Sequence, residues 1–181
     1  MINERELRKA LNILKPDGQL FEIRCLKKSP KRTLSGYFTD VDTAVAELMK
    51  QDLREFNVYF TLSELNPDCY SRRQRDHMII PENTTSDDDV KAYNWLFIDL
   101  DPVRLSDISS SDEELEKAKQ IGRKVYSYLH QIGFEEPVIG MSGNGIHLLY
   151  RIYMRNTEEH NALIKRCLEA LSLLFSTDAV K

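Results

Sequence analysis

The chain lacks three features that would each place it in a particular class of protein. Its 181 residues contain no apolar run near the roughly 20 that a membrane helix needs, and the charged N-terminal stretch has no signal-peptide core. Its three cysteines lie far apart without CxxC spacing, which argues against a disulfide framework and a zinc site. Its formal net charge of -4 argues against coating nucleic acid through overall charge. We therefore expect a cytoplasmic protein with reduced cysteines and no membrane partner.

The apolar content of 41% suits a packed globule, and the N-terminal half has the pattern of an αβ module. Apolar residues recur at helical spacing in two stretches and alternate with polar residues in three others. The first helix is expected to end at the Pro16-Asp17-Gly18 turn. The expected elements are helix Glu4–Leu14, strand Gln19–Leu26, strand Thr33–Thr39, helix Asp40–Arg54 and strand Asn57–Leu62.

The segment from Cys69 to Tyr93 is polar and rich in arginine and aspartate, and a connection this long inside a domain is usually functional or mobile. The second half then alternates strands and helices, with a capping box predicted near Ser111 and a helix end at Gly133. Its expected elements are strand Trp95–Leu100, helix Asp112–Ile132, strand Pro137–Met141, strand Ile146–Tyr153 and helix Thr157–Phe175.

This β-α-β-β-α order lacks one strand of a complete ferredoxin-like split βαβ sheet, which is the architecture of RNA-recognition modules. The predicted fold class is therefore α+β, with an RRM-like sheet packed with an N-terminal αβ module. The predicted boundaries are residues 1–92 for the αβ module with its basic loop and residues 93–181 for the RRM-like module, the two together forming one compact unit.

Two carboxylates, Asp99 and Asp101, come at the end of the strand that begins at Trp95. Side chains alternate along a strand, so residues two positions apart point to the same face. Two acids at the end of a buried strand repel each other and need a cation or a basic partner. An all-oxygen site suits Mg²⁺ or Mn²⁺, so we expect Asp99 and Asp101 to bind one of these ions. Exposed acids at a strand end are the simpler alternative.

A glycine-containing turn, Ser142-Gly143-Asn144-Gly145, leads into the strand that carries His147. The glycines let backbone amides approach an anion, and Ser142 and Asn144 add side-chain hydrogen bonds, which predicts a phosphate site. The alternative is a plain hairpin turn, because Asn-Gly is the favoured type I′ dipeptide. His147 is either a satisfied core residue or, beside this turn, a donor to a triphosphate oxygen.

These two motifs together resemble those of the archaeo-eukaryotic primase superfamily, in its primase-polymerase branch carried by phages and mobile elements. The resemblance rests on apolar-Asp-apolar-Asp ending at Asp101, followed later by Ser-Gly-x-Gly-x-His ending at His147. It covers Trp95–Lys181, and Leu65-Asn66-Pro67 with Arg72 is similar to the N-terminal part of that branch.

The resemblance implies a DNA primase/polymerase domain that joins nucleoside triphosphates on a single-stranded DNA template. In that family the first acids, here Asp99 and Asp101, bind the catalytic metals, and Ser142 and His147 contact the nucleotide phosphates. Arg72, Arg73 and Arg75 are further candidates for binding template or triphosphate, because arginine makes bidentate phosphate contacts. A helicase, linked or separate, is an expected partner in replication. The family's third motif, an acid after the last helix, is not matched by Asp178, so we expect weak metal binding and little activity from these residues.

Two other readings stay open. A nucleotide-sugar glycosyltransferase also uses a strand-end DxD with Mn²⁺, although it does not call for the motif ending at His147. A non-catalytic nucleic-acid-binding module on an RRM-like sheet would leave Asp99 and Asp101 as edge acids, which oppose phosphate unless a metal intervenes.

Overall fold

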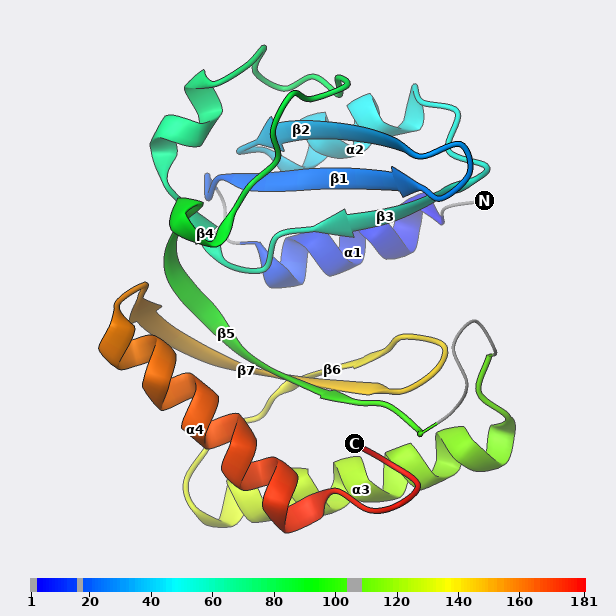
Figure 1. The fold of residues 1–181 in the computed structure, drawn as a ribbon, viewed down its shortest axis with the longest axis vertical. Helices are drawn as coiled ribbons and strands as arrows, with labels where there is room; N and C mark the ends of the chain where they lie inside the picture. The colour runs from blue at the N-terminus through cyan, green and yellow to red at the C-terminus, as the bar shows by residue number, and fades with distance from the viewer. Residues whose placement is uncertain (1–2, 16–17, 104–108) are drawn as a thin grey trace. The chain divides into compact units, whose positions relative to one another are not determined.

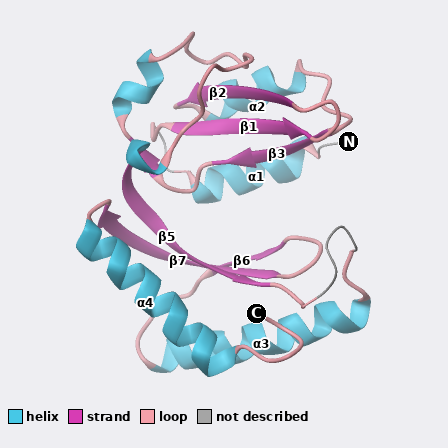
Figure 2. Cartoon of the chain, viewed as in Figure 1, coloured by secondary structure: helices cyan, strands magenta, loops and turns pink. Residues whose placement is uncertain are grey.

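The computed structural model describes residues 3–15, 18–103 and 109–181, and these form a mixed α+β fold with two antiparallel sheets and four α-helices (Figures 1 and 2). The chain divides into two compact units, Met1–Tyr93 and Asn94–Lys181. Pro16 and Asp17, predicted to end the first helix, lie outside the described residues. No helix among the described residues is long and apolar enough to cross a membrane.

The first unit is built on a three-stranded antiparallel sheet with the strand order β2-β1-β3. Its helices and strands are α1 (Glu4–Leu14), β1 (Phe21–Lys27), β2 (Arg32–Phe38), α2 (Val41–Met49) and β3 (Phe56–Phe60). Leu11 of α1 and Val45 of α2 share one core with Phe21 and Ile23 of β1, so both helices cover the same face of the sheet. The predicted hairpin is confirmed, with Phe21 opposite Phe38.

Two boundaries in this unit differ from the expectation. Helix α2 begins after its cap Asp40, whose side chain accepts from Thr43 N–H, but it ends at Met49 instead of Arg54. In the segment after α2, the Arg54 side chain donates two hydrogen bonds to the Asp52 carboxylate. The short strand β4 (Glu64–Leu65), which was not predicted, pairs with the beginning of β5 (Val90–Leu100).

The polar segment before β5 is held by side-chain contacts within the first unit. Arg72 donates to the Asp89 carboxylate at 2.5 Å, and the Arg73 guanidinium lies 4.4 Å from the centre of the Tyr37 ring. Ile79 also pairs with Ser35 of β2 through two backbone hydrogen bonds. These contacts hold in place a segment that has little regular secondary structure.

The second unit contains the later part of β5, α3 (Asp112–Gln131), β6 (Val138–Met141), β7 (Ile146–Arg155) and α4 (Glu158–Phe175). The sheet has the order β4-β5-β7-β6, so β6 is an edge strand (Figure 1). Side chains at alternate positions of β5 and β7 pack on α3 and α4 in a single core. This core includes Leu96, Ile98, Leu100, Ile121, Val125, Ile146, Leu148, Tyr150 and Leu171.

The capping box of α3 is present as predicted, with Ser111 and Glu114 bonding each other's backbone N–H groups. Strand β5 begins at Val90, before the predicted Trp95. The residues that follow α4 turn back, and Val180 forms an antiparallel bridge with Pro102, next to the end of β5. Asp178 precedes this bridge and lies in no strand.

Candidate active site

The end of β5 and the start of β7 bring Asp99 and His147 together on the face of the sheet that points away from the helices. Leu100 and Ile98 are in the helix-covered core, and the alternation of side chains therefore turns Asp99 to the other face. The His147 Nε2 atom lies 3.2 Å from Asp99 Oδ1. The Phe97 ring meets the imidazole edge to face, with centroids 4.9 Å apart, and helps to fix its orientation.

Asp101 is held by its backbone just beyond the end of β5. Its N–H donates to the Lys181 carbonyl and its carbonyl accepts from Lys181 N–H, both at 3.0 Å. Its Oδ1 atom is buried and has no hydrogen-bond partner among the described residues. This oxygen packs against Gly145, where an added Cβ would lie only 2.4 Å from it. The C-terminal segment and the glycine turn together fix this carboxylate.

The surroundings of Asp99 affect its ionisation. The pKa of Asp99 is raised above its usual range, first by burial and then by the charge of Asp101, while His147 opposes the shift. A half-exposed acid with a raised pKa beside a second acid is a place where a cation is favourable.

These residues fit a hard divalent ion as two carboxylate ligands, and the unpartnered oxygen of Asp101 supports that fit. Across residues 3–15, 18–103 and 109–181, no group of three His, Cys, Asp or Glu side chains is arranged to hold a metal. Water or substrate oxygens would have to complete the coordination of an ion at Asp99 and Asp101.

The glycine turn satisfies its own backbone. Ser142 Oγ accepts from the N–H groups of Asn144 at 3.2 Å and Gly145 at 2.9 Å, and Ser142 N–H donates to the Gly145 carbonyl at 3.2 Å. The alternative interpretation, a hairpin turn, is confirmed, but the turn is not of the type I′ kind with Asn144-Gly145 at its centre. The two loop residues are Gly143 and Asn144, and Gly143 has φ +89, the positive value that a type II′ turn places at its first central residue.

Ser110, which the sequence suggested only as a possible helix cap, ties this turn to the segment before α3. Asn144 Oδ1 accepts from Ser110 N–H at 3.2 Å, and the Asn144 carbonyl accepts from Ser110 Oγ at 2.8 Å. An anion at the turn would have to replace Ser142 Oγ as the acceptor of the Asn144 and Gly145 amides.

The predicted arginines belong to the first unit, where Arg72 pairs with Asp89 and the guanidinium groups of Arg73 and Arg75 lie over the rings of Tyr37 and Tyr70. The structure thus brings together Asp99, Asp101, His147 and the turn of residues 142–145 within the second unit. Arg72 forms an ion pair with the largely buried carboxylate of Asp89.

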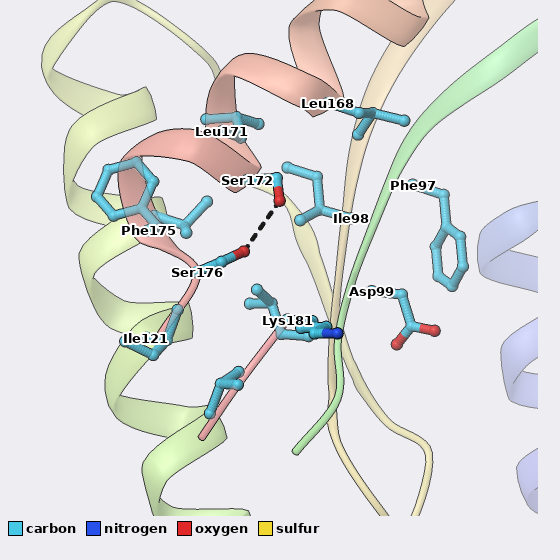
Figure 3. Close-up of a pocket in the computed structure, with 13 residues that line it drawn as sticks. Phe97, Ile98, Asp99, Ile121, Leu168, Leu171, Ser172, Phe175, Ser176 and Lys181 are labelled. Atoms are coloured by element: carbon cyan, nitrogen blue, oxygen red, sulfur yellow. Dashed lines mark hydrogen bonds between the residues drawn. The ribbon is translucent and has the colours of Figure 1, made fainter. Parts of the chain in front are cut away.

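A cavity of about 280 Å³, which was not predicted, lies on the helix-covered side of β5, and the Asp99 carboxylate points away from it (Figure 3). Its apolar lining comes from β5, α3 and α4, and Asp99 and Lys181 also line it. Across it, Ser172 Oγ and Ser176 Oγ lie 3.0 Å apart at the end of α4. Lys181 could not be found from a sequence motif, because only its pairing with Asp101 brings it here.

Comparison of the chain with protein-family models, with curated proteins and with solved structures found no match in any of the three.

Proposed function

We propose that the second unit is the catalytic module of a nucleotidyltransferase that joins nucleoside triphosphates on a single-stranded DNA template. The observation that carries this proposal is the 3.2 Å contact between Asp99 and His147, made by two motifs far apart in the sequence, with Asp101 beside them. Each motif alone has a simple structural explanation, but their convergence on one sheet face is what a metal and triphosphate site requires.

The topology supports the same proposal. A β-α-β-β-α order with both helices on one face and β5 next to β7 is that of a split βαβ sheet of the RRM type. The bridge between Val180 and Pro102 lies where the fourth strand of such a sheet would run. We propose that the module has the primase-polymerase form of this fold.

In the proposed reaction, Asp99 and Asp101 would hold Mg²⁺ or Mn²⁺ on the open sheet face. A bound divalent ion supplies charge neutralisation at the α-phosphate and a lower pKa for an attacking 3′-hydroxyl. His147 would donate from Nε2 to a phosphate oxygen, exchanging its present contact with Asp99 for one with the substrate. The amides of Asn144 and Gly145 would hold the remaining phosphate charge after Ser142 Oγ turns away.

Titration of the full chain with Mn²⁺ and a nucleoside triphosphate tests the proposal. We expect Asp99→Asn and His147→Ala to weaken triphosphate binding by about tenfold or more, because each removes a charge-assisted contact. Glu159→Gln, which removes an exposed acid from the first turn of α4, is the matched control and should bind like the parent. Binding by both site variants at the parent's affinity would refute the assignment.

A second candidate function is nucleic-acid binding without catalysis, and one contact favours it. The Arg151 guanidinium lies 4.9 Å from the centre of the Trp95 ring, so a basic and an aromatic side chain are paired on β5 and β7. Such pairs bind single strands by stacking and by charge. Single-stranded DNA binding that is unchanged by chelation and by Asp99→Asn, together with no triphosphate binding, would favour this function.

A further inference from the structure

The outer edge of β6 carries an apolar strip that is left exposed by the described residues of the second unit. Ile139 and Met141 have exposed fractions of 62% and 60%, and both lie on the edge strand of the sheet. Most edge strands are protected by charge, proline or a bulge, because their free backbone groups can pair with another chain. Here only Pro137, just before the strand, gives such protection.

The backbone register shows which groups of β6 point outward. Ser142 N–H donates to the Gly145 carbonyl, so these two residues form a hydrogen-bonded pair at the end of the hairpin. Such pairs alternate along an antiparallel ladder. Gly140 and His147 are therefore the next bonded pair, and the N–H and C=O groups of Ile139 and Met141 face the outer edge. The residues with exposed apolar side chains are also those with outward backbone groups.

A pocket of about 330 Å³ lies between this strip and α3. Ile139, Ile146 and Leu148 form its sheet side, and Gly122 leaves space on the helix side. The charged residues at this pocket are Lys119 and Arg123, both within salt-bridge distance of Glu116, and Glu136, which accepts from Tyr126 Oη. An incoming strand would find backbone partners, an apolar pocket and charges of both signs.

We propose that this edge binds a second copy of the chain, with β6 pairing antiparallel to the partner's β6 around a twofold axis at Gly140. In this register Ile139 lies opposite the partner's Met141, and Met141 opposite the partner's Ile139. Both are outward-facing residues, so the pairing forms two complete hydrogen-bonded pairs and two apolar cross-strand contacts. A shift that brings Pro137 into the ladder would lose a donor.

The charges are arranged so that a twofold axis brings opposite signs together. Glu136 lies before β6, and its carboxylate is bonded to Tyr126 of α3. Gly122, one turn earlier in α3, packs on Ile146, which is opposite Met141, so Lys119 lies toward the other end of β6. Antiparallel pairing therefore sets the Glu136 end of one copy beside the Lys119 end of the other. This complementarity favours a second copy over an unrelated peptide.

Sedimentation equilibrium of the full chain tests the proposal. A small interface of this kind predicts a dissociation constant between about 10 μM and 1 mM. Ile139→Lys and Met141→Lys should each weaken association by about tenfold or more, because each replaces both apolar cross-strand contacts by a lysine opposite an apolar residue. Leu173→Lys, which changes a leucine of α4 that is 88% exposed, is the control and should leave association unchanged.

Charge reversal tests the orientation of the two copies. Lys119→Glu and Glu136→Lys should each weaken association, and the double variant should recover part of the loss, because the opposite charges are again paired across the axis. A double variant that is weaker than either single variant would refute the antiparallel register.

A measurement on the parent chain avoids the risk that a variant misfolds. Amide exchange at Ile139 and Met141 should slow as protein concentration rises, while Gly140, already bonded to β7, should not change. Monomeric behaviour up to about 1 mM would overturn the proposal, as would association that is insensitive to both lysine variants. Triphosphate binding is not needed for any of these outcomes.

Discussion

Replacing Gly145 with alanine should disturb the candidate site through space alone. The Cβ of an alanine there would lie 2.4 Å from Asp101 Oδ1 and 2.4 Å from the Leu100 carbonyl oxygen. The carboxylate could rotate, but the carbonyl belongs to the end of β5 and cannot move without shifting the strand. Gly145 itself does not have positive φ, so the backbone conformation adds no reason for glycine at this position.

The expected loss is the cost of overpacking, about 2–3 kcal/mol in the free energy of unfolding. Urea unfolding at neutral pH measures it, with two matched glycines of the same hairpin as controls. Gly140→Ala, where the nearest atom is His147 Cβ at 3.6 Å, should cost far less. Gly143→Ala meets nothing within 4 Å and should lose only about 1 kcal/mol, from its φ of +89. A Gly145→Ala protein as stable as Gly140→Ala would refute the close approach of the turn to Asp101.

Arg72→Ala should lower the free energy of unfolding by about 1–3 kcal/mol, because it leaves the largely buried Asp89 carboxylate unpaired. Arg72 holds the pKa of Asp89 far below its usual range, so this stability is complete above about pH 5 and is lost progressively as pH falls below the unfolded-state pKa of about 3.9. The difference between parent and variant in urea unfolding should therefore be smaller at pH 3 than at pH 7. Tyr150→Phe should leave stability unchanged or raise it by up to about 1 kcal/mol, because Tyr150 Oη is buried without a partner among the described residues, and a larger thermal destabilisation would contradict this. Ser111→Ala should cost about 1 kcal/mol by removing the capping box with Glu114, and an unchanged melting temperature would show that the cap contributes nothing.

Local patterns in the sequence predicted most of the elements, because their causes are local. The spacing of Leu7, Leu11 and Leu14 defines α1, and the capping box at Ser111 marks the start of α3. The errors fall where tertiary pairing decides. Strand β5 begins at Val90 because β4 pairs with it there, and the two residues of β4 are too few to give a pattern.

In the candidate site, too, the features with local causes could be predicted, and those that depend on tertiary contacts could not. Alternation along β5 and β7 is a sequence property, and it turns Asp99 and His147 away from the core that holds Ile98 and Leu148. The pairing of β5 with β7 does not follow from that alternation. The partners of the turn could not be predicted. Ser142 Oγ serves two amides of its own turn and Ser110 holds Asn144, and each choice depends on how the segment before α3 approaches the hairpin.

Asp101 connects the C-terminal segment and the glycine turn to Asp99. Its backbone is paired with Lys181, its side chain packs on Gly145, and its charge raises the pKa of Asp99. A movement of the C-terminal segment would therefore reach Asp99 through the strand end, and a movement of the turn would reach it through the carboxylate. Because the Asp101 oxygen at Gly145 has no partner among the described residues, a cation held with Asp99 would stabilise both contacts at once. Ion binding should thus be coupled to the order of the turn and of the C-terminal segment.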